Sequence, residues 1–215
     1  MQYSLRFINL NNYRILKYHE NYKNENLNEI KSTSNSLMLF ISFITILLIS
    51  VGPEAIKILG PENFWQAKYV IMPLVIGSLF QYLAATYTSI QVYCKKTFFI
   101  PIGTLLAASI NFGLNLILIP IYGFEGAAFS TLLSFVAYSF FHMLVYKRVA
   151  KKDIYDDKYL WFIGLSTTIL SYFIYLTYDL FFWRYFLLLL ILSLLYIFEK
   201  KKILSIFQFI FEKYR

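Results

Sequence analysis

The chain has 215 residues, of which 59% are hydrophobic, 20% aromatic and only 15% charged, and its mean hydropathy is +0.57. Soluble domains carry roughly a quarter charged residues, and a soluble core of this size could not hide so much apolar surface. The net charge of +8 would suggest nucleic acid binding in a soluble protein, but here the charges lie between long apolar blocks. Composition therefore predicts an all-α integral membrane protein without a nucleic acid partner.

The N-terminal residues 1–33 are polar, rich in Asn and mixed in charge. They contain no short apolar core before a small-residue cleavage site, so no signal peptide is predicted. We expect residues 1–33 to form a polar cytoplasmic segment, residues 34–199 a transmembrane domain and residues 200–215 a basic cytoplasmic tail.

A helix needs about 20 apolar residues to cross roughly 30 Å of hydrocarbon. The hydropathy pattern predicts six such helices, at about 35–51, 67–93, 98–119, 124–146, 159–178 and 181–198. The second stretch is long enough to tilt or protrude, and Pro73 offers it a kink site. The last two stretches are joined by a tight turn around Asp179.

The basic residues are unevenly divided between the two sides that six spans would create. The N-terminal segment, the second and fourth connections and the C-terminal tail hold 17 of the 20 Lys and Arg residues. The opposite side holds only Lys57, Lys68 and Arg184. Positive charge is retained in the cytoplasm, so both termini are predicted to be cytoplasmic.

The middle of each predicted span contains no Asp, Glu, Lys or Arg. This absence disfavours a proton or sodium relay within these helices, and no metal or cofactor site is predicted. His142, near the cytoplasmic end of the fourth span, is expected to be packed or interfacial and not a titrating site. A single cysteine, Cys94, excludes an intrachain disulfide and reads as a small apolar residue near a helix end.

Asn111 and Asn115 are four residues apart in the third span and therefore share one face of the helix. An amide in hydrocarbon needs hydrogen-bond partners, which lipid does not offer. This face must look at another helix or at a wet cavity. The amides could hold helices together or line a polar path, and the residues alone favour the first role.

The next residues along the chain predict a tight hairpin between the third and fourth spans. Pro120 is expected to end the third helix, and Gly123 to supply the turn. Small residues then recur on one face of the fourth span, which allows close approach of helices. They are Gly126, Ala127, Ser130, Thr131 and Ser134.

The run NFGLNLILIPIYGFEGAAFSTLLS at 111–134, preceded by KKTFFIPIGTLLAAS at 95–109, resembles bacterial polysaccharide flippases of the Wzx type. These belong to the multidrug/oligosaccharidyl-lipid/polysaccharide exporter superfamily. Their pattern has a Lys-containing inner loop, two asparagines four apart before Ile-Pro, and a small-residue start of the next helix. The matching residues are Asn111, Asn115, Ile119, Pro120, Gly123, Gly126, Ala127, Ala128, Ser130 and Thr131. The likeness extends more weakly over about 13–150.

The resemblance implies a carrier that moves undecaprenyl-diphosphate-linked oligosaccharide to the outer leaflet of the bacterial cytoplasmic membrane by alternating access. The family has 12 to 14 spans in two lobes around a central cavity. Six spans would make this chain the C-terminal portion, truncated or split from its N-terminal half and inactive alone. Family cavities are typically cationic. The polar candidates for a substrate path here are Gln81, Asn111, Asn115, Lys68 and Arg184. Lys68 and Arg184 stand near the outer starts of their spans, where the role of interfacial anchors is favoured for both.

Other functions remain open at this point. A membrane polysaccharide polymerase of the same pathway would need catalytic groups in a sizeable outer loop, and the predicted outer loops are short. A cation-coupled drug exporter of the same superfamily would need a buried acidic residue, which the middle of each predicted span lacks. The chain could also be an inert remnant without activity. The expectation is therefore a transporter portion and not an enzyme, with lipid-linked oligosaccharide, membrane lipids and the missing half as partners.

Overall fold

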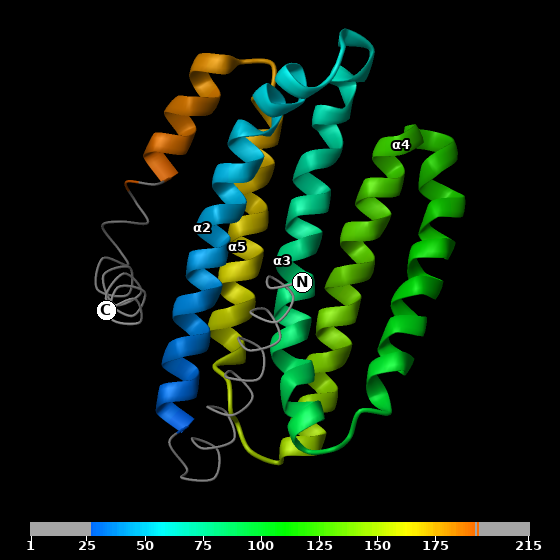
Figure 1. Cartoon of the computed structure of the whole chain (residues 1–215), viewed down its shortest axis with the longest axis vertical. Helices are drawn as coiled ribbons and strands as arrows, with labels where there is room; N and C mark the ends of the chain where they lie inside the picture. The colour runs from blue at the N-terminus through cyan, green and yellow to red at the C-terminus, as the bar shows by residue number, and fades with distance from the viewer. Residues whose placement is uncertain (1–26, 192, 194–215) are drawn as a thin grey trace, which may run out of the picture.

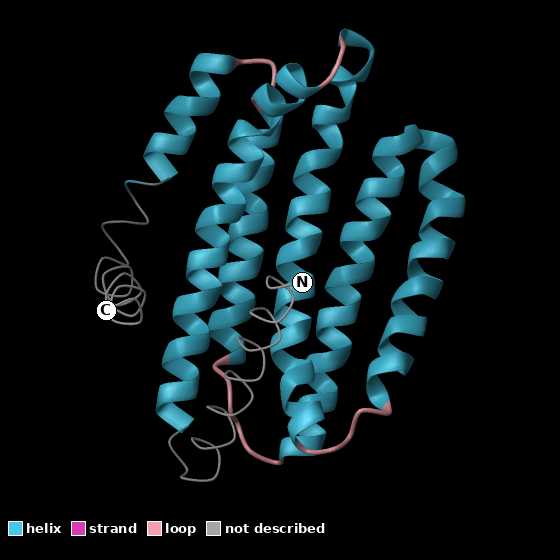
Figure 2. Ribbon diagram, in the orientation of Figure 1, coloured by secondary structure: helices cyan, strands magenta, loops and turns pink. Residues whose placement is uncertain are grey.

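The computed structural model describes residues 27–191 and 193, and this part of the chain is helical, without strands (Figures 1 and 2). The all-α prediction is confirmed for these residues. The labelled elements are α2 (Leu27–Leu59), the 3-10 helix η1 (Glu62–Ala67), α3 (Lys68–Tyr93), α4 (Phe99–Ala150) and α5 (Asp157–Leu176). A short apolar helix, Phe181–Ile191, comes after α5. The expected tail at 200–215 and residues 1–26 of the expected polar segment lie outside the described residues, whereas residues 27–33 of that segment belong to α2.

Four helical stretches are long and apolar enough to cross a membrane: Leu27–Leu59, Glu62–Tyr93, Phe99–Ala150 and Asp157–Leu176. A multi-pass membrane protein is therefore supported, although the count of six is not confirmed. The third and fourth predicted spans both lie in α4. Of the sixth predicted span, the structure describes a helix over Phe181–Ile191, and residues 192 and 194–198 of that span lie outside the described part of the chain.

Helix α4 is a hairpin, with two arms that run side by side in opposite directions (Figure 1). The chain reverses at Gly123, whose φ of 59° and ψ of −138° are not helical and suit a residue without Cβ. The prediction that Pro120 ends the first arm was wrong, because the helix continues through it to Gly123. Proline removes one hydrogen bond but keeps a helical φ, so the reversal needs the glycine.

The core lies between α2, α3 and α5, which stand side by side in Figure 1. Buried apolar residues of α3 recur every three or four positions, so one stripe of this helix faces its neighbours. They are Ile76, Phe80, Leu83, Tyr87 and Ile90. The second arm of α4 packs on α3, whereas the first arm lies outermost and exposes large apolar side chains such as Leu105 and Phe112.

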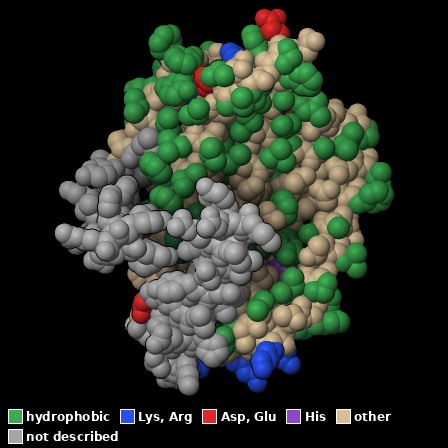
Figure 3. Space-filling view, in the orientation of Figure 1, with side chains coloured by type: hydrophobic (Ala, Val, Ile, Leu, Met, Phe, Trp, Pro, Cys, Tyr) green, Lys and Arg blue, Asp and Glu red, His purple; other side chains and the backbone are tan. Residues whose placement is uncertain are grey.

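Successive helices alternate in direction, so their connections fall at two ends of the bundle (Figure 1). One end, here called the basic end, carries the start of α2 and the loops at 94–98 and 151–156. Its cations, some of which form the blue cluster at the bottom of Figure 3, are Lys31, Lys95, Lys96, Lys147, Arg148, Lys151, Lys152 and Lys158. At the opposite end the described basic residues are Lys57, Lys68 and Arg184.

Candidate functional site

The two asparagines form a hydrogen-bonded cluster between the arms of α4, here called the amide cluster. Asn111 Nδ2 donates to Thr131 Oγ1 at 3.3 Å, and Asn115 Nδ2 donates to Asn111 Oδ1 at 3.0 Å. Ser130 Oγ donates to Asn115 Oδ1. The amides and Thr131 are half-buried and Ser130 is fully buried. The expectation that this face meets another helix is confirmed.

Small residues of the second arm make this close approach possible. A Cβ added at Gly126 would run into the backbone carbonyl of Leu118 on the first arm. Ala128, two residues later, is buried. The hydroxyls of Ser130 and Thr131 also donate to the backbone carbonyl of Ala127, each at 2.9 Å. The small residues of the second arm therefore form the contact between the two arms, and the polar side chains of both arms are hydrogen-bonded there.

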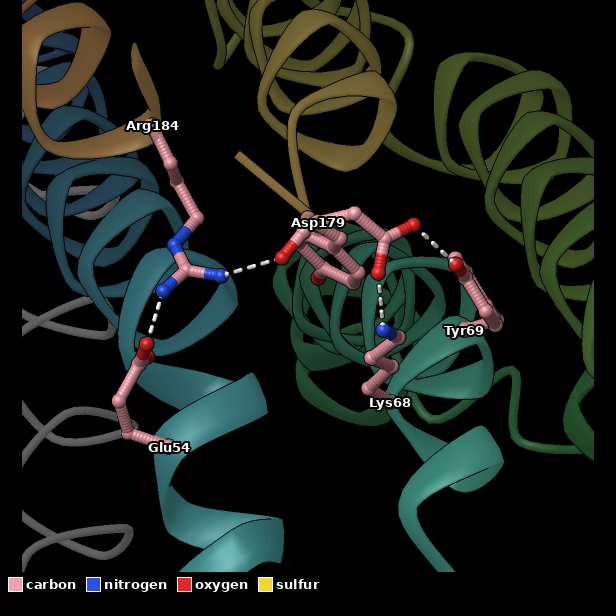
Figure 4. Close-up of polar contacts among 6 residues, drawn as sticks. Glu54, Lys68, Tyr69, Asp179 and Arg184 are labelled. Carbon is pink, nitrogen blue, oxygen red and sulfur yellow. Dashed lines mark hydrogen bonds and ion pairs between the residues drawn. The ribbon is translucent and has the colours of Figure 1, made fainter. Parts of the chain in front are cut away.

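A second polar arrangement lies at the opposite end, where Lys68 and Tyr69 begin α3 (Figure 4). Lys68 Nζ lies 2.5 Å from Asp179 Oδ1, and the Tyr69 hydroxyl donates to Asp179 Oδ2 at 2.7 Å. Asp179 stands in the turn after α5. The hydrogen bond from Lys68, together with the one from Tyr69, lowers the pKa of the Asp179 carboxyl below its ordinary value.

Arg184, on the short helix, forms an ion pair with Glu54 of α2 and donates to the backbone carbonyl of Tyr178 at 2.9 Å (Figure 4). Only 1% of Arg184 is exposed. Arg184, Leu188 and Ile191 are buried at helical spacing, so one face of the short helix rests on the bundle. Lys68 and Arg184 thus each have a carboxylate partner, and together they join α2, α3 and the chain after α5.

The predicted path residues therefore do not form one lined cavity. Lys68 and Arg184 lie in the ion-pair region at the opposite end, whereas Asn111 and Asn115 lie between the arms of α4. Gln81 is exposed on α3 and makes no hydrogen bond within the described part of the chain. In this arrangement the five residues can hold helices together and offer amides to a polar ligand. Because Lys68 and Arg184 are both paired with carboxylates, they do not form a free cationic surface.

A buried polar pair was missed by the sequence prediction. Gln91 Nε2 of α3 lies 2.9 Å from His142 Nδ1 of the second arm of α4, and both side chains are fully buried. The prediction that His142 is a packed side chain is confirmed. The sequence did contain a signal for this pair, because Gln91 is an amide near the end of a long apolar run. A buried amide needs a hydrogen-bond partner.

The described residues contain no group of three or more His, Cys, Asp and Glu side chains that could hold a metal ion. Cys94 is half-buried after the end of α3, and burial raises the pKa of its thiol. No known protein family matches the sequence, and neither a curated protein nor a solved structure is significantly similar to the chain.

Proposed function

We propose that this chain supplies one lobe of a carrier that moves undecaprenyl-diphosphate-linked oligosaccharide from the inner to the outer leaflet of a bacterial cytoplasmic membrane. The observation that carries the proposal is the hairpin of α4. The residues that resemble the flippase pattern, from Asn111 to Thr131, are the ones that join its two arms. The role is transport and not catalysis.

The distribution of charge supports an orientation for this lobe. The cations of the basic end lie in loops and at helix ends, as expected for segments retained in the cytoplasm. We therefore place the basic end inside and the turn around Asp179 outside. Substrate would be taken up at the basic end and released at the opposite end.

Alternating access needs two lobes that rock about a site near the middle of the membrane. This chain offers amides to such a site, and Lys68 and Arg184 at the opposite end are engaged with carboxylates. The negative charge of a diphosphate would then be met mainly by a second lobe. The proposed partner is that second lobe, the N-terminal half of a complete carrier.

Complementation tests the proposal. The chain is expressed in a bacterium that lacks its polysaccharide flippase, either alone or together with the N-terminal lobe of a flippase, and surface polymer is measured. We expect polymer only with both lobes. Full restoration by the chain alone would refute the single-lobe proposal. Restoration of long polymer in a strain that lacks only its polymerase would favour the enzyme alternative instead.

A further inference from the structure

One face of α3, here called the α3 face, is not covered by the other described helices. Its residues recur at alternating steps of four and three positions from near the start of the helix to its end. All are exposed except Thr88, which is half-buried. They are Leu74, Ser78, Gln81, Ala85, Thr88 and Val92. Small and polar side chains therefore occupy the middle of this face, at the depth of the hydrocarbon.

The exposed faces of α2 and α5 have a different composition. They carry large apolar side chains, which suit contact with lipid. On α2 these are Ile44, Leu48 and Val51, and on α5 they are Phe162, Leu165 and Ile169. The bundle thus has outer faces that suit acyl chains, and the α3 face is unlike them.

Gln81, close to the middle of α3, is the polar centre of the α3 face. Ser78 and Thr88 donate their hydroxyls to carbonyls of their own helix, each at 3.1 Å, which satisfies them without a partner helix. Gln81 makes no hydrogen bond with any residue that the structure describes. Its carboxamide has both a donor and an acceptor, and neither can be satisfied by hydrocarbon. It therefore needs a polar partner from outside the described helices.

We propose that the α3 face is the contact with a second copy of this chain, in which the two Gln81 carboxamides are paired. Both copies insert with the same end in the cytoplasm, so the two-fold axis that relates them runs along the membrane normal. A residue beside this axis meets its own counterpart. Since a carboxamide both donates and accepts, the two copies of Gln81 can exchange two hydrogen bonds. This contact does not depend on the proposed carrier function.

The rest of the α3 face suits such a pair. Alternating steps of four and three residues form the seam of a left-handed helix pair, the commonest crossing in membranes. Ser78 and Ala85, on either side of Gln81, are small enough for the helices to approach closely. No residue of the face is charged, so two copies do not repel each other there. An acyl chain or an apolar helix would leave the Gln81 amide unpaired.

Cysteine cross-linking tests the contact in the full chain, in membranes of the expressing cells. Cys94→Ser removes the native thiol, and Ala85→Cys places a new one on the α3 face. After mild oxidation, we expect disulfide-linked dimers on a denaturing gel. Leu165→Cys, exposed on the apolar face of α5, is the matched control and should give few. Equal cross-linking at the two positions would indicate random collisions and would overturn the proposal, as would its absence at residue 85.

Gln81→Leu tests the amide itself. Chains labelled with donor and acceptor dyes are reconstituted over a range of protein-to-lipid ratios, and energy transfer gives the dissociation constant of the dimer. Losing two interhelical hydrogen bonds should raise this constant about sevenfold. Ser109→Leu, at an exposed polar position on the first arm of α4, should leave it unchanged.

Two further outcomes would overturn the proposal. The first is a dimer of Gln81→Leu that is as strong as the dimer of the unaltered chain, because the amides would then not be paired. The second is cross-linking at residue 85 that is lost when the N-terminal lobe of a flippase is coexpressed and replaced by a cross-link to a cysteine on that lobe. The α3 face would then belong to the contact between lobes and not to a second copy.

Discussion

Gly103 and His142 are in direct contact across the two arms of α4. A Cβ built on Gly103 would lie 2.5 Å from His142 Nε2, and Gln91 of α3 approaches the other ring nitrogen at 2.9 Å. Three helical segments therefore meet at one buried imidazole. The pair that joins α3 to the hairpin depends on the absence of a side chain at residue 103.

Enlarging Gly103 should therefore loosen the hairpin from α3. We expect Gly103→Leu to lower the free energy of unfolding by about 1–3 kcal/mol, the usual cost of overpacking a filled site. Gly113→Leu is the matched control, because it lies on the same arm and nothing stands within 4 Å of its added Cβ. Unfolding in mixed micelles with increasing SDS measures both. Equal losses for the two variants would contradict the contact.

The Glu54–Arg184 pair gives a second prediction. Arg184→Leu leaves Glu54 without its partner at a partly buried position, and removing one member of a buried pair costs about 3–5 kcal/mol. The double variant with Glu54→Leu should recover most of that loss, because no unpaired charge remains. A double-mutant cycle on thermal unfolding checks this.

The Lys147–Asp157 pair at the basic end serves as the control for that cycle. Its nitrogen and oxygen lie 2.8 Å apart, but 43% of the Lys147 side chain is exposed. The Asp157 side chain is only 11% exposed, but it keeps a hydrogen bond from the Tyr146 hydroxyl at 2.8 Å, so Lys147→Leu should cost less than Arg184→Leu. A loss of similar size for Lys147→Leu and Arg184→Leu would show that burial does not strengthen the Glu54–Arg184 pair.

Asp179 predicts a dependence of stability on pH. Its hydrogen bonds from Lys68 and Tyr69 lower the pKa of its carboxyl in the folded protein. The pKa of an Asp in an unfolded chain is about 3.9. The stabilisation is then present above the unfolded pKa and is lost as pH falls through the lower, folded pKa. The effect is modest because the carboxylate is largely exposed.

Thermal unfolding between pH 6 and pH 3 should accordingly fall more steeply for the unaltered chain than for Asp179→Asn. Above pH 5 the variant should be the less stable of the two, and the curves should converge on acidification. Asp153→Asn, exposed at the basic end, is the control and should keep the steep profile. Parallel profiles for the unaltered chain and Asp179→Asn would show that the pair contributes nothing to folding.

Local relationships were predictable from the sequence, and distant ones were not. The amide cluster was predictable because Asn111 and Asn115 lie one helical turn apart and their partners come after a single reversal. The ion pairs were not, since Lys68 and Asp179 are 111 positions apart and Arg184 and Glu54 are 130 apart. Span positions do not specify which helices pack together. The sequence therefore offered Lys68 and Arg184 only as path candidates or interfacial anchors, without their carboxylate partners.

The reversal in α4 shows a second limit. Proline and glycine were both expected to shape it, and only Gly123 has a non-helical backbone. Pro120 cannot donate a backbone hydrogen bond, but its ring fixes a φ that a helix accepts, so the helix can run past it. A positive φ is costly for residues other than glycine. A glycine is therefore a stronger sequence signal for a chain reversal than a proline.

The last prediction separates two roles of the amides. Asn111→Leu with Asn115→Leu removes two hydrogen bonds between the arms, and such bonds average about 0.6 kcal/mol each in membranes. Ser130 and Thr131 keep their bonds to the Ala127 carbonyl, so the free energy of unfolding should fall by only about 1 kcal/mol. In the complete carrier, surface polymer should fall further than the amount of folded protein.

Ser130→Ala with Thr131→Val is the informative counterpart, because it removes the same bonds between the arms and keeps both amides. This variant also loses the bonds from Ser130 and Thr131 to the Ala127 carbonyl, so it should lose at least as much stability as the asparagine variant. If the amides contact substrate, it should nevertheless retain more transport. If they only hold the arms together, the two variants should lose folded protein and transport in equal proportion. The ratio of surface polymer to folded carrier in each strain therefore decides whether the hairpin contributes polar groups to a path.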